Sequence, residues 1–145
     1  MRDNMNGLDF LVAFPPKAAV ADGTAQVSAI LDRLGYDSVT LLLLTGTLTD
    51  ADATWSVLLE ESDDGTTFTA VADDDLIGTE ALAGFTFAAD DACRKLGYRG
   101  TKRYLRATVD DVTANTGNLF LAGAWICGHP DRQATPNPPV LAPHT

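Results

Sequence analysis

The sequence predicts an all-β fold, a β-sandwich of the jelly-roll kind, and two patterns carry this prediction. Turn-forming residues recur about every ten positions, with short apolar or alternating runs between them. No segment of about a dozen residues repeats its apolar positions with the period of a helix. The length of 145 residues fits a single domain that can bury a core.

We divide the chain into three parts. Residues 1–24 form an N-terminal arm, residues 25–129 the β-sandwich domain, and residues 130–145 an extended tail. The tail is rich in proline, which favours a conformation close to polyproline II. Pro138 and Pro139 are our candidate partner contacts in this tail.

The arm contains an alternating apolar pattern over residues 8–14 that favours a short strand. Pro15 and Pro16 then stop it, because proline cannot donate to a sheet ladder. Two interpretations carry equal weight: a strand along the edge of the sheet, or an arm that docks on a neighbouring subunit. In the second case Phe10 and Phe14 make the contact.

The next two strands organise the domain. Residues 39–44 are apolar on both faces except at Thr40, which predicts a central strand covered on both sides or at a subunit contact. Residues 55–62 alternate as a half-buried strand does. We expect these two strands to form the first long hairpin.

Further turns and strands follow. Residues 26–31 are either a strand or one helical turn. Residues 63–66, Asp-Asp-Gly-Thr, predict a tight hairpin turn. Residues 93–98 and 103–109 predict two strands of another hairpin, and residues 118–127 the last long strand.

The charge balance excludes one class of partner. The chain has 20 acidic and 10 basic residues and a formal net charge of −10, whereas nucleic-acid binding needs clustered cations. Most of the cations nevertheless lie between positions 94 and 106, and they are Arg94, Lys95, Arg99, Lys102, Arg103 and Arg106. They form either a solvated hairpin or a contact patch for an acidic neighbour.

Cysteine and histidine usage predicts no metal centre and no cofactor. Cys93 and Cys127 are expected as two small buried side chains, with a disulfide between neighbouring strands as the alternative. His129 and His144 lie near the C-terminal end, outside any metal-ligand spacing. The sequence shows neither a secretory signal nor a transmembrane helix, so we expect a protein made and kept in the cytoplasm, without membrane contact.

Acidic pairs are the obvious candidates for chemistry, and they occur at residues 63–64, 73–75, 90–91 and 110–111. Each lies in an expected turn, where aspartate bonds the local backbone. Calcium binding is the weaker alternative, and acid–base catalysis weaker still. No nucleophile–base pattern occurs, so we expect a protein that is not an enzyme.

Three stretches have a distinctive combination of residues: ILDRLGYDSVT (30–40) continuing through 45–50, LEESDDGTTFTAV (59–71) and LGYRGTKRYLR (96–106), with 128–130 closing the domain. Together they resemble a family of small structural proteins of tailed bacteriophages, encoded near the major capsid protein. The resemblance covers roughly residues 28 to 130 and brings no catalytic residues with it.

The resemblance implies a capsid decoration, or cement, protein on the capsid surface of a virion, made in the cytoplasm of a bacterial host. Its partners would be the major capsid protein and further copies of the chain, as a dimer or trimer. One alternative is a head fibre or spike that holds host glycans on an exposed aromatic platform of Trp55, Tyr98 and Trp125. Another is a head–tail connector or tail component.

Overall fold

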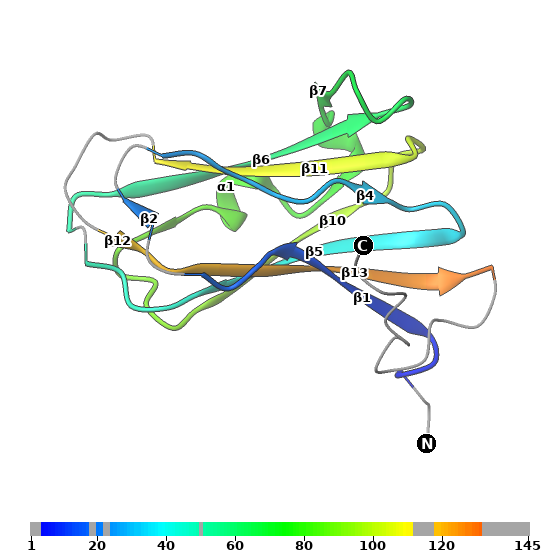
Figure 1. Ribbon diagram of the computed structural model, residues 1–145. Coiled ribbons are helices and arrows are strands. Elements are labelled where there is room, and N and C mark those ends of the chain that lie inside the picture. The colour runs from blue at the N-terminus through cyan, green and yellow to red at the C-terminus, as the bar shows by residue number, and fades with distance from the viewer. Residues whose placement is uncertain (1–3, 18–19, 22–23, 50, 112–117, 132–145) are drawn as a thin grey trace.

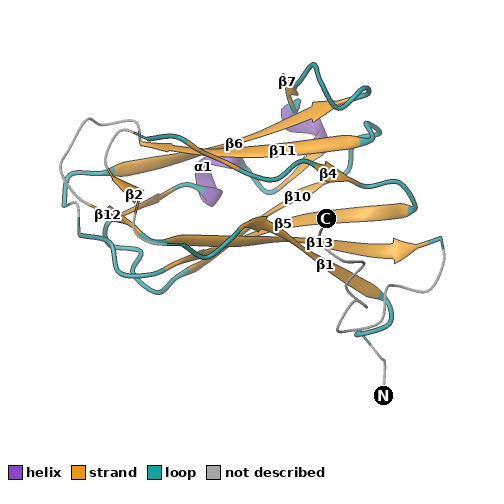
Figure 2. Ribbon diagram, viewed as in Figure 1, coloured by secondary structure: helices purple, strands orange, loops and turns teal. Residues whose placement is uncertain are grey.

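The computed structural model describes residues 4–17, 20–21, 24–49, 51–111 and 118–131. Two antiparallel sheets lie one above the other as a sandwich (Figures 1 and 2). The first sheet has the order β1 (Leu8–Phe14), β13 (Leu121–Pro130), β5 (Tyr36–Thr45), β10 (Cys93–Tyr98), β8 (Leu76–Ile77). The second has the order β3 (Gln26–Val27), β11 (Tyr104–Asp111), β6 (Thr54–Ser62), β7 (Thr69–Ala70).

Short elements complete the fold. β4 (Leu31–Asp32) also pairs with β11, β9 (Phe85–Thr86) pairs with β6, and β12 (Asn118–Leu119) pairs with β2 (Val20–Ala21). A 3₁₀ turn, η1 (Asp73–Asp75), and one short helix, α1 (Glu80–Ala83), lie between β7 and β9. Among the described residues, no helix is long and apolar enough to cross a membrane.

The strand order is that of a jelly roll. We number the eight strands of the jelly roll in chain order. They are β1, the β3–β4 segment, β5, β6, the β7–β9 segment, β10, β11 and β13. The two sheets then have the orders 1-8-3-6 and 2-7-4-5, with β8 added at one edge. Successive strands mostly alternate between the sheets, as in the double Greek key of this fold. The predicted fold class is confirmed.

The core lies between the two sheets. Alternate residues of β5 and β13 point into it from one side, and alternate residues of β6 and β11 from the other. Trp125, Leu41 and Leu105 are each at most 1% exposed. The central position predicted for residues 39–44 is confirmed, because β5 pairs with β13 on one side and β10 on the other.

The prediction of two long hairpins, one from residues 39–44 and 55–62 and one from residues 93–98 and 103–109, is wrong. β5 and β6 lie in different sheets, and so do β10 and β11. Each pair is joined by a connection that crosses the sandwich. Arg33 holds the second crossing, since its guanidinium donates to the carbonyl of Gly100 at 3.2 Å. Alternating side chains give a strand its two faces, but they do not identify the strand it pairs with.

Residues 8–14 form an edge strand of the first sheet. β1 pairs with β13 from Leu8 opposite Gly128 to Phe14 opposite Gly123, with a bulge between Val12 and Phe14. Of the two interpretations offered for this segment, the structure shows the edge strand. The N-terminal arm expected over residues 1–24 therefore contributes to the sandwich itself.

The predicted turn at residues 63–66 and one of the two alternatives for residues 26–31 are confirmed. Gly65 has a φ of +73° in the turn after β6, as the hairpin turn at residues 63–66 requires. This turn leads into β7, which pairs back onto β6. Residues 26–31 contain β3 and the start of β4, so the strand alternative holds.

Candidate functional site

The outer face of the first sheet is apolar across all five strands. The pairing registers place Phe10, Ile126, Thr40, Gly97 and Ile77 in one row across the sheet. The neighbouring rows share the same side of the pleat. We call this surface the apolar face; its residues are Leu8, Phe10, Val12, Ser38, Thr40, Leu42, Leu44, Ile77, Cys93, Lys95, Gly97, Ala122, Ala124, Ile126 and Gly128.

Large side chains on the apolar face are open to solvent. Val12 and Ile77 are each 59% exposed, at opposite edges of the sheet, and Leu44 is 45% exposed on the central strand. Their neighbours Val39, Leu41 and Leu43 in β5 point the other way and are buried. β5 is therefore apolar on both faces, but the described residues bury only its inner face.

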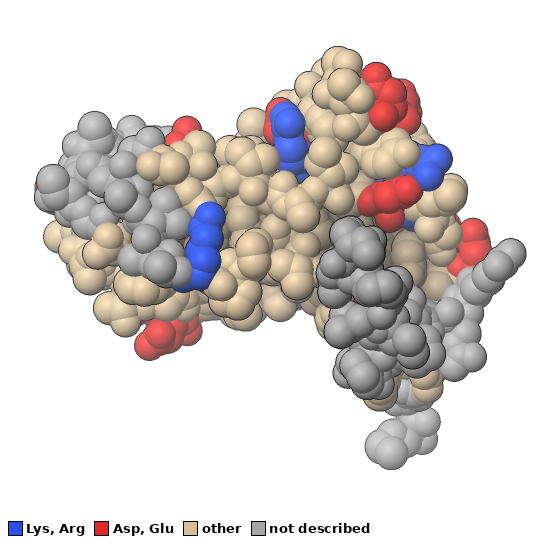
Figure 3. All heavy atoms as spheres, in the orientation of Figure 1, with Lys and Arg blue, Asp and Glu red and all other residues tan. Residues whose placement is uncertain are grey.

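Charge is nearly absent from the apolar face. Lys95 is its one charged residue, although the whole chain carries −10. The outer side of the second sheet differs. There Glu60 and Arg106 form an ion pair at 2.8 Å, and the Arg106 guanidinium lies 4.3 Å from the centroid of the Phe68 ring. Figure 3 shows broad uncharged areas, and some of the basic side chains in it lie directly beside acidic ones.

One end of the apolar face is hollowed. A shallow pocket of about 260 Å³ lies there, lined by Leu44, Ala122, Phe120 and Pro16, with Lys17 at its side. Phe120 is 39% exposed and packs against Gly46. This hollow gives the otherwise flat surface a place where a partner side chain can insert.

The predicted basic cluster is divided by the structure. Lys102 forms an ion pair with Asp63, and Arg103 binds both carboxylate oxygens of Asp32, at 2.9 and 2.7 Å. The Arg103 hydrogen bonds lower the pKa of Asp32. Three of the six cations, Arg106 included, thus pair with acidic residues of the same chain. That arrangement is not the single hairpin patch expected.

The other three cations lie apart. Arg99 donates to the backbone carbonyl of Asp74 at 2.6 Å. Lys95 lies on the apolar face, and the part-buried Arg94 occupies the alternate position of β10. Their expected role in partner binding stays a prediction.

The two candidate contact residues of the N-terminal segment separate. Phe10 is 57% exposed on the apolar face, whereas Phe14 is buried in the core and is not on the surface. Phe14 lies beyond the bulge, which turns its ring inward against Gly123. Pro138 and Pro139 lie outside the described residues.

The aromatic platform proposed for glycan binding is not at the surface. Trp55, Tyr98 and Trp125 are 4%, 3% and 1% exposed. The Tyr98 hydroxyl donates to Glu61 at 2.6 Å, and burial together with this bond raises the pKa of Tyr98. The Trp125 indole donates to the carbonyl of Ala29 at 3.2 Å. These rings serve the core, so the glycan-binding alternative loses its named site.

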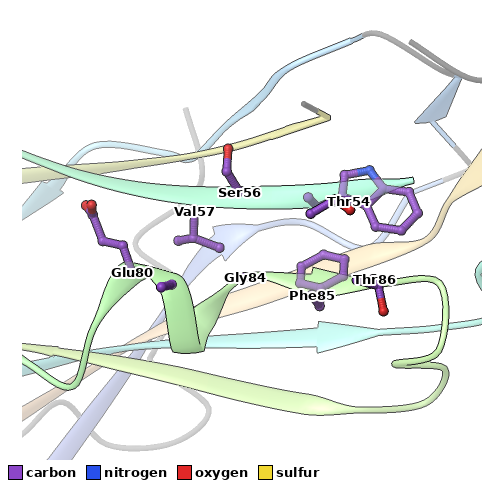
Figure 4. A pocket seen from close by; sticks show the side chains of 9 residues that line it. Thr54, Ser56, Val57, Glu80, Gly84, Phe85 and Thr86 are labelled. Carbon is purple, nitrogen blue, oxygen red and sulfur yellow. The ribbon is translucent and has the colours of Figure 1, made fainter. Parts of the chain in front are cut away.

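A second hollow lies beside α1. The pocket has a volume of about 420 Å³ between β6 and the α1–β9 segment (Figure 4). Trp55 and Phe85 stack in its wall with ring centroids 5.3 Å apart. The Glu80 carboxylate, its acidic group, accepts a hydrogen bond from the Leu59 amide at 2.7 Å. Glu80 thus occupies a position where a neighbouring strand would otherwise pair with β6.

The cysteines are both free and lie on strands that flank β5 from opposite sides. The disulfide alternative is therefore not realised. Cys93 is exposed rather than buried as expected, whereas Cys127 is buried. Burial raises the pKa of the Cys127 thiol to about 11, with a smaller effect from Asp9. Within the described ranges, no group of three or more His, Cys, Asp or Glu side chains is placed to hold a metal ion.

The sequence did not predict the apolar face as a whole. It predicts the two-faced apolar character of residues 39–44, but for residues 118–127 and 8–14 it predicts strands alone. The missed signal is that both sets of alternate positions are uncharged from Ala122 to Gly128. It becomes a surface only when β1, β13 and β5 lie side by side.

Comparisons with known proteins add little to this description. No family model and no curated protein matches the chain. Among solved structures, a xylanase 10C of Cellvibrio japonicus in complex with xylopentaose aligns at 10% identity and a TM-score of 0.44. That match covers 88% of this chain and 28% of the xylanase, so the chain spans under a third of its length.

Two further structures illustrate the range. A carbohydrate-binding module specific for non-crystalline cellulose aligns at 11% identity and a TM-score of 0.36, covering 88% of this chain and 87% of the module. The VP2 protein of infectious bursal disease virus aligns at 12% identity and a TM-score of 0.33, covering 85% of this chain and 40% of VP2. These proteins include structural and binding roles, and at such low similarity they do not choose a role for this chain.

Proposed function

We propose that this protein is a non-enzymatic structural protein of a tailed-phage virion, a capsid decoration protein that lays its apolar face on the outer shell. The observation that carries the proposal is the apolar face itself. A soluble domain with a net charge of −10 leaves one whole sheet face almost uncharged. Large exposed apolar surfaces of this kind mark interaction sites.

The residues of the face suit a broad and shallow contact. The face is nearly flat at Ala122, Ala124 and Gly97, because these residues have small side chains or none. Leu44 and the hollow beside it interrupt this flat surface. A shell stabilised by many copies of such a contact gains strength because the individual contacts act together. The resemblance in residues 30–50, 59–71 and 96–106 supports the major capsid protein as the partner.

We propose no catalytic role. The most polar residue of the α1 pocket, Glu80, is already engaged in holding a backbone amide of β6. The jelly-roll fold by itself leaves the choice open, because it occurs in viral capsid and lectin domains alike.

The test is binding of the purified protein to expanded capsids that lack it. We expect stoichiometric binding and a higher temperature of capsid disruption. Leu44→Glu places a charge on the apolar face and abolishes binding. Leu58→Glu is the matched control, since Leu58 is 38% exposed in β6, at an alternate position to the buried Val57 and Leu59 of that strand.

Two results would contradict the proposal. Wild-type protein that does not bind the capsids rules out a cement role. Equal loss of binding by both variants removes the apolar face as the contact. Binding to portal or tail structures instead of the shell favours the connector alternative.

A further inference from the structure

β1 is an edge strand with an open side. It pairs with β13 on one side, and no other described strand pairs with it on the other side. Among the described residues its far end is closed, where the Ala29 amide donates to the Ala13 carbonyl at 2.9 Å. The open stretch is therefore Leu8–Val12, whose backbone groups on that side pair with no other strand that the structure describes.

The side chains of this stretch are unusually apolar for an open edge. Phe10, Leu11 and Val12 are 57%, 41% and 59% exposed. In the described part of the chain, no other run of three consecutive large apolar residues is exposed to this degree. Leu11 belongs to the row of Trp125 and Leu41 on the inner side, so the sandwich itself is incompletely closed along β1.

The β1 edge has few of the features that normally prevent an edge strand from pairing with another chain. Edge strands of soluble proteins are usually short, or carry lysine or proline. Here Pro15 and Pro16 come only after the strand has ended. Asp9 is the one acidic residue of the strand; its carboxylate accepts from the Phe10 amide at 3.1 Å and from the Tyr36 hydroxyl at 2.5 Å. The first of these bonds is exposed and can be exchanged for a main-chain bond.

We propose that the open edge of β1 pairs in antiparallel fashion with the same edge of a second copy of this chain. Pairing centred on Phe10 sets the two Phe10 rings side by side and places Val12 next to Leu8 of the partner subunit. An antiparallel pair of identical strands satisfies a two-fold axis, so one surface serves both subunits. Aromatic and β-branched cross-strand neighbours stabilise such a pair.

The distribution of charge leaves this edge accessible to a second copy. Two chains of −10 repel each other over most of their surfaces. The outer row of β1 is Leu8, Phe10 and Val12 and carries no charge. Pairing joins the two first sheets into one, so the two apolar faces become a single surface of doubled area. The dimer does not depend on the proposed function, since it forms from the isolated chain.

The test uses sedimentation velocity of the full-length chain over a concentration series. We expect a species of twice the 15.3 kDa chain mass. Val12→Lys weakens association at least about tenfold, because it sets two ammonium groups into the junction. Ile77→Lys is the matched control: Ile77 is also β-branched and 59% exposed, at the opposite edge of the same sheet, and its variant stays dimeric.

Wild-type protein that sediments as a monomer throughout overturns the inference, and so does a trimer, which has no two-fold axis. Equal effects of the two lysines also overturn it. Amide hydrogen exchange gives a check that needs no variant. Exchange at Leu8–Val12 slows as the dimer forms, and unchanged exchange there places the contact elsewhere. Capsid binding is measured in a separate experiment with the Leu44→Glu variant. Failure of the dimer proposal and failure of the proposed function can therefore be distinguished.

Discussion

Asp64 accepts three hydrogen bonds on one carboxylate oxygen, from the amides of Thr66 and Thr67 and from the hydroxyl of Ser62, each at 2.8 Å. These bonds lower the pKa of Asp64 from 3.8 to about 2. The acidic pair at residues 63–64 is thereby explained by the turn, as the sequence indicated. Asp64 fixes the backbone, and Asp63 pairs with Lys102.

The pH dependence of stability follows from this shift. A carboxyl whose pKa falls on folding stabilises the folded state above its unfolded pKa. The contribution of Asp64 is complete above pH 3.8 and disappears as the pH falls toward about 2. We expect Asp64→Ala to lower the free energy of unfolding at neutral pH, and the difference from wild type to shrink over this window.

Urea denaturation at a series of pH values measures this difference. Asp73→Ala is the control, because within the described structure the Asp73 carboxylate accepts no hydrogen bond, although it too lies in a turn. A deficit of Asp64→Ala that stays constant down to pH 2 would show that the side chain acts through something other than its charge.

At the scale of single elements, β5 shows how a two-faced apolar strand divides its roles. Its inner residues lie under β6 and β11, while Leu42 and Leu44 face outward. The inner residues contribute to stability because they fill a close-packed interior. The outer ones contribute little to it, which leaves them free to serve an interaction.

Alanine substitutions should separate the two faces. Leu41→Ala leaves a cavity in the core and costs about 2–5 kcal/mol of unfolding free energy. Leu44→Ala removes a side chain that is already 45% exposed, and we expect a cost of about 0.5 kcal/mol or less. Chemical denaturation of both variants checks the prediction. Similar costs at the two positions would mean that the outer face is packed against something within the chain.

At the scale of the whole molecule, the two sheets present different surfaces. The second sheet carries the Glu60–Arg106 pair and faces water, whereas the first carries the apolar face. Three of the six basic residues between 94 and 106 form ion pairs with acidic residues of the same chain. A contact through the apolar face and a contact through free cations therefore respond to salt in opposite ways.

Salt decides between these two contacts. Raising the salt concentration from about 0.05 M to about 0.5 M shortens the screening length and removes repulsion between acidic surfaces. We expect capsid binding to be maintained or strengthened over this range, measured by co-sedimentation with capsids. Binding that weakens steeply with salt would instead assign the contact to the cluster of arginines and lysines.

The fold class and the positions of several turns follow from the amino-acid sequence alone. Alternating residues, aspartate–glycine turns and the two-faced run at residues 39–44 are local features, and local sterics and burial dictate them. The same local logic predicted the strand at 93–98 and the positive φ at Gly65. It also named Phe10 and Phe14 together as partner contacts, and of the two only Phe10 is exposed.

The identity of neighbouring strands, in contrast, emerges from the three-dimensional fold. Pairing is non-local, so the crossings from β5 to β6 and from β10 to β11 could not be told from hairpins. In the observed pairing Lys102 and Arg103 lie next to acidic partners, Trp55, Tyr98 and Trp125 are buried, and a bulge in β1 turns Phe14 inward. The pairing also assembles the apolar face from strands at both ends and the middle of the chain, since a surface exists only once its strands lie side by side.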